Sequence, residues 1–464
     1  MKNALFEKRS RIEAPVEAVF QWHARPGAIE RYSPPWDPIK VIRRSGGIET
    51  GAKVAIRMKA GPIPYIWKAR HTDFQENRLF RDEQISGPFS EWIHSHHFEA
   101  DGPDACYVTD SISYRLPPHP FRQALSYRMV ENKLARIFNY RHFTLKHDLR
   151  VQLGYPSDPP LSILVTGSSG LIGSALVPFL TTAGHKVLKM VRRPPQSSDE
   201  IFWDPGSKDL NPSDLEGIDA VVHLAGESIG MGRWTQQKRD KILSSRIDGT
   251  RLLVNTLKAM PHPPEVLLSA SAIGYYGDRG DQVLNDSEQS GHDFVSDVCK
   301  RWEDEAIEAE SVGIRTALLR IGVVLDQGGG ALKELLPAYR LGIIPKIYSG
   351  SQYVSWIGLN DTVDAIYHLI MSPGIKGPVN IVAPHPVTSD QLAQQLASTI
   401  GSKLGIRLSR RVIKGMFGQK GEEILLSSTR VIPEKLQQSD FVYRHDHLAL
   451  LLQTIFGLEK EGKG

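Results

Sequence analysis

The most constraining feature of this sequence is a short apolar run that leads directly into three evenly spaced glycines. Residues 163–173 read Ile-Leu-Val-Thr-Gly-Ser-Ser-Gly-Leu-Ile-Gly. The apolar residues predict a buried parallel strand, and residues 171–183 predict the helix that follows it. Strand, glycines and helix in this order are typical of a turn that binds the pyrophosphate of a dinucleotide. We therefore expect a doubly wound parallel α/β sheet of the Rossmann type.

Each glycine of this turn has its own expected role. Gly167 suits the tight turn, Gly170 lets the backbone approach a pyrophosphate, and Gly173 lets helix and strand pack closely. The first N–H groups of the helix and its positive dipole end favour the phosphates. The alternative is an ordinary glycine-rich turn from strand to helix. The residues predicted to bind the cofactor here are Thr166, Gly167, Ser168, Ser169, Gly170, Leu171, Ile172 and Gly173.

Length and composition predict a multidomain protein of the soluble globular class. A chain of 464 residues exceeds what one hydrophobic core usually holds, so two or three domains are expected. Hydrophobic residues make up 41% and charged residues 23%, and no apolar run reaches the length of a membrane span. The start of the chain lacks the apolar core of a signal peptide, which predicts a cytoplasmic protein. Cys106 and Cys299 are expected to be reduced thiols in different domains.

Charge is unevenly distributed along the chain. Residues 1–150 carry 24 Lys and Arg against 17 Asp and Glu, whereas the remainder carries 32 against 35. Much of the basic excess lies between residues 121 and 150, where apolar residues keep roughly helical spacing. A solvated helix face is the expected explanation, and an acidic ligand, a membrane surface or a nucleic acid is the alternative. The apolar positions are Leu125, Met129, Leu134, Ile137 and Phe138, with Arg141 among the basic ones.

The chain divides at a turn-rich, proline-stiffened connector. We predict a front domain at 1–150, a linker at 151–160 and a nucleotide-binding domain from 161 to 400. The front domain is expected to be an α+β domain with a short helix at its start, several antiparallel strands and a long final helix. A curved sheet wrapped round that helix would enclose a cavity for an apolar ligand. The predicted strands are 53–59, 64–72, 91–99 and 106–116, and the short helix is 14–23.

Two histidines alternate along the third of these predicted strands. His94 and His96 share one face with Trp92 by the period of two, and Asp110 lies on the next strand. If the turn at 100–104 sets the register, His96 lies opposite Asp110. A hydrogen-bonded polar cluster, a ligand pocket and a metal site are the alternatives, and because no third firm ligand is evident we assign no metal.

The front domain resembles the helix-grip, polyketide-cyclase-like (START-like) domains. Members of that superfamily bind hydrophobic ligands or act as cyclases, so the resemblance implies a hydrophobic ligand without naming it. The motifs that carry the resemblance are Phe80-Arg81-Asp82-Glu83-Gln84, Gly87-Pro88-Phe89, Trp92-x-His94-x-His96 and Pro34-Pro35-Trp36.

The second strand of the nucleotide-binding domain favours NADP over NAD. Residues 186–191 end in Arg192 and Arg193 where an acidic residue would bind the ribose 2′-hydroxyl of NAD. An arginine there can bind the 2′-phosphate of NADP instead. The alternative is a pair of surface arginines.

Two further apolar runs predict strands that end at the ligand edge of the sheet. The first, at 219–226, places His223, Ala225 and Gly226 beneath the cofactor. The second, at 267–272, ends in Ser271, our predicted polar contact to the substrate, although a serine at a strand end is often only a turn cap.

These motifs resemble the extended short-chain dehydrogenase/reductase superfamily, and most closely its atypical subgroup of epimerase family proteins. The resemblance covers residues 161–445, so 401–464 is expected to be the C-terminal extension of that subgroup. It implies a cofactor role for Arg246 and Thr250 and a substrate role for Glu227. The matching motifs are Trp203-Asp204-Pro205, Gly226-Glu227-Ser228-Ile229, Ser245-Arg246-x-x-Gly249-Thr250, Ser269-Ala270-Ser271-Ala272, Gly274-Tyr275-Tyr276-Gly277 and Ser351-Gln352-Tyr353-Val354-Ser355-Trp356-Ile357.

The catalytic motif of that superfamily is absent. Its oxidoreductases use Tyr-x-x-x-Lys on a helix, in which the tyrosine moves a proton and the lysine lowers the tyrosine's pKa. The corresponding positions here hold Val295 and Cys299. Tyr275 or Tyr276, just beyond Ser271, is the candidate replacement, and an aromatic pocket lining is the alternative.

Further along the chain, polar and aromatic residues predict substrate contacts. They are Gln352, Ser355 and Trp356. Gly328, Gly329 and Gly330 predict a loop over the substrate side.

Three functions remain open from the sequence. The first is an NADP-dependent epimerase- or reductase-like enzyme acting on a small molecule, with a front domain that shelters a hydrophobic ligand. The second is a cofactor-binding regulator or sensor without proton-transfer chemistry. The third is a cyclase or lipid-binding module with a structural Rossmann half. A homo-oligomer is compatible with each, and no nucleic-acid or membrane signal stands out.

Overall fold

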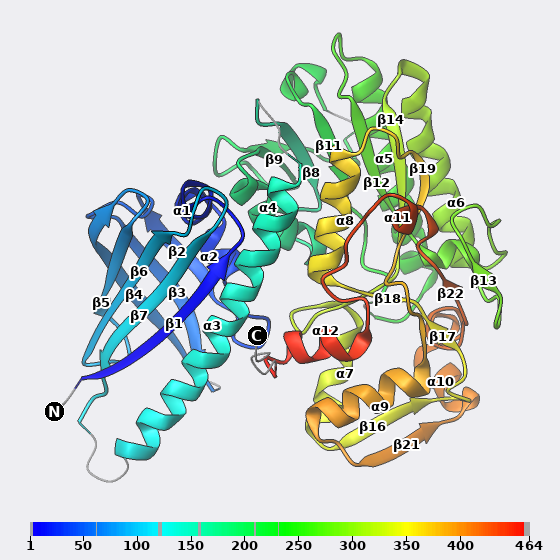
Figure 1. Ribbon diagram of the computed structural model, residues 1–464. Coiled ribbons are helices and arrows are strands. Elements are labelled where there is room, and N and C mark those ends of the chain that lie inside the picture. Colours follow the sequence, from blue (N-terminus) through cyan, green and yellow to red (C-terminus); the bar gives the residue numbers. More distant parts are fainter. Residues whose placement is uncertain are drawn as a thin grey trace. The chain divides into compact units, whose positions relative to one another are not determined.

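The computed structural model describes residues 3–61, 63–118, 123–155, 159–207, 210–230 and 232–458 (Figure 1). The chain forms two compact units. The first comprises residues 1–157 together with 178–184 and 453–464, and the second comprises 158–177 and 185–452. Among the described residues, no helix has both the length and the apolar character needed to cross a membrane.

The first unit is a seven-stranded antiparallel sheet in the order β1-β7-β6-β5-β4-β3-β2, with a long helix against it (Figure 1). That helix, α3 (Gln123–Leu153), packs on β1 and contributes Leu134, Ile137 and Phe138 to the core. The predicted α+β helix-grip fold is therefore confirmed. The strands are β1 (Ala4–Ile12), β2 (Lys40–Ser45), β3 (Lys53–Ala60), β4 (Ile63–Gln75), β5 (Leu79–Ser86), β6 (Glu91–Ala100) and β7 (Cys106–Arg115), and the short helices are α1 (Val16–Ala24) and α2 (Ala28–Arg31).

The four predicted strands correspond to β3, β4, β6 and β7, whereas β1, β2 and β5 were missed. The missed strands are rich in charged residues, so their apolar alternation is weak. In the final helix, Met129 is a correction, since its side chain is 65% exposed and does not belong to the core. Phe121 and Arg122, where that helix was predicted to start, lie outside the described residues.

The predicted domain boundaries stay predictions. The front domain was predicted to end at 150, and α3 runs to Leu153. Residues 156–158 of the predicted linker lie outside the described residues. Beyond residue 400, β21 (Leu404–Leu408) pairs in parallel with β16 (Ile343–Ile347), and the second unit extends to residue 452.

The second unit contains a seven-stranded, fully parallel sheet in the order β10-β9-β8-β11-β12-β14-β19. The chain runs outward from β8 to β10 and then returns to β11 on the other side of β8. This reversal is the topological switch point at which doubly wound sheets bind ligands, so the predicted Rossmann fold is confirmed. The strands are β8 (Ser162–Thr166), β9 (Lys186–Val191), β10 (Glu200–Phe202), β11 (Ala220–His223), β12 (Val266–Ala272), β14 (Arg315–Ile321) and β19 (Gly377–Ile381).

Helices lie between these parallel strands and after the last of them, and segments that follow β12, β14 and β19 form smaller strand pairs (Figure 1). The helices are α4 (Leu171–Ala183), α5 (Gln236–Lys258), α6 (Phe294–Ile307), α7 (Gly330–Arg340), α8 (Leu359–Met371), α9 (Ser389–Ile400), α10 (Arg410–Phe417), α11 (Glu434–Gln438) and α12 (Leu448–Ile455). Besides β16 with β21, the additional pairs are β13 (Val283–Leu284) with β22 (Arg430–Val431), β15 (Val323–Leu325) with β18 (Trp356–Gly358), and β17 (Tyr353–Val354) with β20 (Val387–Thr388).

Candidate functional site

The glycine turn follows β8 directly and begins α4. Gly167 has φ of +67°, and a Cβ built on it would lie 2.8 Å from the backbone of Leu224. A Cβ on Gly173 would lie 2.3 Å from the carbonyl oxygen of Gly167. A Cβ built on Gly170, by contrast, would have one neighbour within 4 Å among the described residues beyond its chain neighbours, the carbonyl oxygen of Gly167 at 3.2 Å. Packing therefore requires Gly167 and Gly173, whereas Gly170 borders open space, which fits an approaching pyrophosphate.

A buried hydrogen-bonded chain fixes the two strand ends next to this turn. The hydroxyl of Thr166 lies 2.8 Å from Nδ1 of His223, whose Nε2 lies 3.0 Å from the hydroxyl of Thr250. Leu224 and Ala225 donate their N–H groups to the same Thr166 oxygen at 3.1 Å each. Burial lowers the pKa of His223 to about 4, so the ring is neutral. His223 and Thr250 have no accessible surface, and their contact with a cofactor stays a prediction.

The turn after β11 is held by an arginine from α5. Arg246 donates to the backbone oxygen of Glu227 at 3.0 Å, and its Cζ would lie 3.2 Å from a Cβ built on Gly226. A side chain at position 226 would therefore require the guanidinium to shift by a few tenths of an ångström. The side chain of Glu227 forms an ion pair with Lys238 at 2.5 Å, and that hydrogen bond is the main cause of the lowered pKa of Glu227.

The two arginines after β9 differ in their surroundings. Both are exposed, but Arg193 forms a two-pronged pair with Glu200 of β10, with both N···O distances 2.8 Å. Arg192 lies close enough to Glu227 for its charge to contribute to the lowered pKa of that carboxyl group. The expectation of a 2′-phosphate contact therefore falls chiefly on Arg192.

Ser271, at the end of β12, is part of a buried polar network. Its hydroxyl donates to Glu303 of α6 at 2.6 Å, and Glu303 accepts two bonds from Arg320 of β14 at 2.9 and 2.8 Å. Arg320 also donates to the hydroxyl of Tyr276 at 3.0 Å. The serine was predicted to contact the substrate, and the structure places its hydroxyl against a carboxylate of the protein.

The two candidate tyrosines lie in the short 3-10 helix η2 (Ile273–Tyr276) and have different environments. Tyr276 is fully buried, its hydroxyl donates to Asn380 at 2.7 Å, and burial raises its pKa to about 12. Tyr275 is half-buried, and the Cζ of Arg320 lies 3.5 Å from the centre of its ring. Tyr275 is therefore the predicted catalytic tyrosine that retains accessible surface.

Helix α6 has no titrating group where the superfamily motif would place one. Val295 and Cys299 are both buried, and Cγ1 of Val295 would lie 2.4 Å from a Cβ built on Gly274. Burial raises the pKa of Cys299 to about 12, which excludes a thiolate near neutral pH. Lys300 is exposed, as expected for a residue rotated away from the motif position.

The predicted substrate contacts after β16 are buried within the protein. Gln352 donates to the backbone oxygens of Ile347 and Leu425 at 3.2 and 3.3 Å. Ser355 donates to the backbone of Thr429 at 2.8 Å, and the indole of Trp356 donates to that of His385 at 3.0 Å. Ser355 and Trp356 have no accessible surface, and Gln352 and Ser355 both bond to the C-terminal segment, so a substrate role for the three residues stays a prediction.

The glycine-rich loop after β15 lies close to the cofactor turn. A Cβ on Gly329 would lie 2.9 Å from the side chain of Leu171, the first residue of α4. Asp326 in this loop accepts the N–H of Gly328 at 2.6 Å, and burial raises the pKa of its carboxyl group to about 6. Sequence reasoning missed Asp326, because nothing in a lone Asp before glycines indicates burial.

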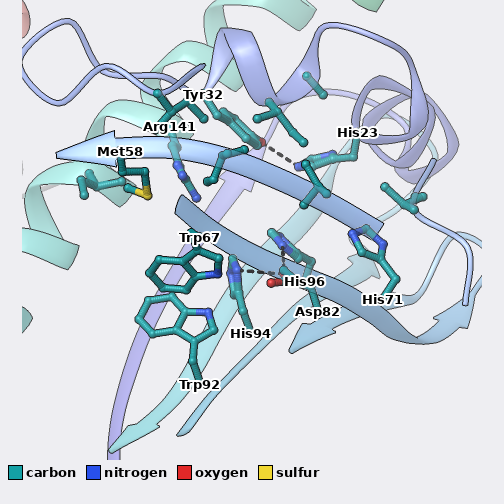
Figure 2. Close-up of a pocket in the computed structure, with 18 of the residues that line it drawn as sticks. His23, Tyr32, Met58, Trp67, His71, Asp82, Trp92, His94, His96 and Arg141 are labelled. Atoms are coloured by element: carbon teal, nitrogen blue, oxygen red, sulfur yellow. Dashed lines mark hydrogen bonds and ion pairs between the residues drawn. The ribbon is translucent and has the colours of Figure 1, made fainter. Parts of the chain in front are cut away.

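The first unit encloses a cavity of about 380 Å³ (Figure 2). Apolar side chains form most of its wall, including Met58, Trp67 and Trp92. His94 and His96 of β6 project into it from the sheet. Such a cavity can hold an apolar molecule beside a few polar groups.

The predicted register between β6 and β7 is confirmed. His96 is paired with Asp110 and His94 with Ile112. Oδ1 of Asp110 lies 2.6 Å from Nδ1 of His96 and 2.9 Å from Nε2 of His94. The other carboxylate oxygen of Asp110 lies 2.6 Å from His142, which reaches it from α3. Sequence reasoning missed His142 because its position depends on how the helix crosses the sheet.

A second carboxylate, Asp82 of β5, faces the same two histidines. Its Oδ2 lies 3.4 Å from Nδ1 of His94 and 3.8 Å from Nε2 of His96. Burial alone would lower the pKa of His94, but the hydrogen bonds with Asp110 and Asp82 outweigh it and raise the pKa to about 9. Asp82 was missed as a member of the cluster because its strand was missed.

Two other polar residues of the cavity wall come from helices. His23 of α1 is bonded to the Tyr32 hydroxyl at 2.6 Å and to the backbone of Val19 at 2.7 Å, and burial lowers its pKa to about 3. Arg141 of α3 lines the cavity, and burial lowers its pKa. The basic residues of this helix were predicted to be solvated, and Arg141 is a correction, since its side chain is half-buried in the cavity wall.

Comparison with known protein families supports both halves of the chain. Residues 163–381 match the model described as the NAD dependent epimerase/dehydratase family. Residues 12–138 match the model described as polyketide cyclase / dehydrase and lipid transport, and residues 410–455 match a domain of unknown function. Both resemblances predicted from the sequence are confirmed.

Individual relatives cover the second unit, and one solved structure covers both. An epimerase family protein of Mycobacterium bovis is 36% identical over 284 residues, which are 61% of this chain and 94% of the relative. The structure described as a nucleoside-diphosphate sugar epimerase from Corynebacterium glutamicum is 30% identical, with a TM-score of 0.81 and coverage of 99% of this chain and 91% of the other. The structure of the human epimerase family protein SDR39U1 with NADPH is 30% identical, with a TM-score of 0.60 and coverage of 64% and 99%.

Proposed function

The chain belongs to the NAD dependent epimerase/dehydratase family, and on that basis we propose that it binds NADP(H) and acts on a small molecule at the carboxyl edge of its parallel sheet. The observation that carries this proposal is the glycine turn at the switch point of the sheet. Gly170 borders open space there, while Gly167 and Gly173 are fixed by packing. A dinucleotide pyrophosphate needs this combination of a closely approachable backbone and a helix N-terminus.

The choice of NADP over NAD rests on the end of β9. Arg192 is exposed there, and no acidic side chain follows the strand to bind a ribose 2′-hydroxyl. Arg193 is engaged by Glu200, which leaves Arg192 as the residue to contact a 2′-phosphate. The NADPH in the structure of the human relative supports the same choice.

The chemistry we propose is epimerase- or reductase-like. A bound nicotinamide supplies hydride transfer. Among the protein's own groups, Tyr275 is the candidate for moving a proton, because it is half-buried at the ligand edge while the Tyr276 hydroxyl is held by Asn380. The Ser271 hydroxyl does not face solvent but holds Glu303 by a hydrogen bond. The guanidinium of Arg320, which pairs with Glu303, lies against the ring of Tyr275.

A second candidate function is a cofactor-binding regulator or sensor without hydride chemistry. The observation that favours it is the pair Val295 and Cys299, which are buried and hold no titrating group near neutral pH at the motif positions. This candidate requires tight NADPH binding with no hydride exchange.

The third candidate, a cyclase or lipid-binding module, rests on the apolar cavity of the first unit.

Calorimetric titration of the purified full chain with NADPH and NADH tests the proposal. We expect NADPH to bind more tightly, by about tenfold or more. Small molecules released from the purified protein and identified by mass spectrometry should include NADP(H). Binding of neither nicotinamide cofactor would overturn both cofactor-based functions.

A second measurement separates the enzyme from the regulator. The released small molecules are returned to the NADPH-loaded protein, and the nicotinamide absorbance is followed. A change in absorbance that the Tyr275→Phe variant slows, at unchanged NADPH affinity, supports the enzyme. Tight NADPH binding without any exchange supports the regulator.

A further inference from the structure

The cavity of the first unit contains a group of metal-ligating side chains that the proposed function does not use. Asp82, His94 and His96 each offer one ligand atom, and these atoms all lie within 4.8 Å of one another. Figure 2 shows the two imidazoles and the carboxylate close together, and all three line the cavity. The three side chains come from the neighbouring strands β5 and β6, which hold them in a rigid sheet.

The other ring nitrogens of both histidines lie against Asp110. Nε2 of His94 is hydrogen-bonded to Asp110 at 2.9 Å, and Nδ1 of His96 lies 2.6 Å from the same carboxylate oxygen without the geometry of a hydrogen bond. This arrangement leaves Nδ1 of His94 and Nε2 of His96 on the side of Asp82. Metal-binding histidines are typically fixed in this way by a carboxylate on the far ring nitrogen, which sets both the tautomer and the ring orientation.

We propose that Asp82, His94 and His96 form a binding site for one divalent transition-metal ion, with Asp110 as the residue that positions both histidines. The composition of two histidines and one carboxylate is typical of zinc and of non-haem ferrous iron sites with open positions. The proposal concerns the first unit and does not depend on the NADP(H) site.

The distances suit an ion of that class. Ligands about 2.1 Å from a tetrahedral ion are about 3.4 Å apart. The Asp82 oxygen lies 3.4 Å from the His94 nitrogen and 3.8 Å from the His96 nitrogen. The two histidine nitrogens lie within 4.8 Å of one another, so the three atoms must draw together to reach the spacing of a bound ion. Packing restricts larger movements, since Phe80 stacks on His96 with ring centres 4.0 Å apart.

The open coordination positions of this site face an apolar cavity. Trp67 and Trp92 form the wall beside His94, with the Trp92 and His94 ring centres 6.5 Å apart. Three protein ligands and an open side are typical of a metal that binds a substrate or ligand rather than one that only stabilises a fold. The ligand that fits is an apolar molecule with one oxygen donor, such as a carboxylate or an enolate.

Zinc titration of the chelator-treated full-length protein, followed by calorimetry, tests the proposal. We expect one Zn²⁺ per chain with Kd on the order of 1 μM or tighter. His94→Ala, His96→Ala and Asp82→Asn should each weaken this binding by about 100-fold or more, and Asp110→Asn by about 10- to 100-fold. His97→Ala is the matched control, because this histidine is on the same strand but exposed on the other face.

A second group among the described residues must be separated from this site. His385, Asp446 and His447 also bring ligand atoms within 4.8 Å, but all three are exposed. The double variant His385→Ala/His447→Ala should leave the tight binding event unchanged. Loss of zinc binding in that double variant, with retention in the cavity variants, would overturn the proposal.

A measurement on the unchanged protein guards against variants that fail to fold. Anomalous diffraction from a zinc-soaked crystal should place the ion within about 2.3 Å of His94, His96 and Asp82. Absence of an ion there at saturating zinc would contradict the proposal, whatever the variants do. Circular dichroism of each variant shows whether a lost binding event reflects a lost ligand or a lost fold.

Discussion

The hydroxyl of Ser271 donates a hydrogen bond of 2.6 Å to Glu303, a buried carboxylate that also holds the guanidinium of Arg320. The serine at the ligand edge of the sheet is thus linked to a charge pair between α6 and β14. Because Arg320 lies against the ring of Tyr275, this pair connects the predicted catalytic residues to the core of the domain.

Glu303→Gln should strongly destabilise the second unit. The substitution leaves the Arg320 charge buried without its carboxylate, which typically costs about 3–5 kcal/mol. Urea unfolding measures the loss. Glu305→Gln, on the same helix, removes a more exposed pair with Arg251 and should cost about 1 kcal/mol or less. Equal effects of the two substitutions would show that the buried network does not stabilise the unit.

Gly170→Asp should abolish NADPH binding without unfolding the protein. The new carboxylate would enter the open space at the turn and repel the pyrophosphate. Calorimetry measures binding, and thermal unfolding measures the fold. The control is Gly374→Asp, which adds the same charge at a position where a Cβ would meet no atom within 4 Å among the described residues. Unchanged NADPH affinity in Gly170→Asp would place the cofactor elsewhere.

Arg192→Ala should reduce the preference for NADPH over NADH. A lost charge-assisted contact to the 2′-phosphate is worth about 1.5–3 kcal/mol, which corresponds to about 10- to 100-fold in the affinity ratio. Arg193→Ala should change the ratio little, because Glu200 already engages that guanidinium. If the double substitution leaves the ratio unaltered, the 2′-phosphate assignment is incorrect.

Asp326→Asn should stabilise the protein increasingly as pH rises. Burial raises the pKa of this carboxyl group from 3.8 to about 6, so the folded state holds its proton more tightly than the unfolded state. The contribution of this group to the free energy of unfolding is fully present below the pKa of the unfolded state. It is lost as pH rises through the pKa of the folded state. The advantage of the variant should therefore grow by about 2 kcal/mol between about pH 4 and about pH 7.

Urea unfolding of both proteins across that pH range measures this effect. The amide oxygen of asparagine can still accept the N–H of Gly328, so the loop conformation should be kept. Asp297→Asn, at an exposed position of α6, is the control for general charge effects. A stability difference that does not vary with pH would mean that Asp326 is not the titrating group.

The sequence predicted the features that depend on local chemistry. The run from Thr166 to Gly173 specifies its own turn. Gly167 has a positive φ, and the backbone comes so close to Gly167 and to Gly173 that only glycine fits at either position. The period of two placed His94 and His96 on one face, and a short turn fixed their register against Asp110. These relationships span few residues, so the pattern alone determines them.

The tertiary structure decided which of these groups act together. Asp82 joins the histidines only because the charged strand β5 pairs with β6, and His142 reaches Asp110 only because α3 crosses the sheet. Likewise Ser271, Ser355 and Trp356 are buried by segments far along the chain. The sequence alone determined the dinucleotide turn and the fold class, because both follow from local conformation. The fold decided which side chains face a ligand, because burial and long-range contact are properties of packing.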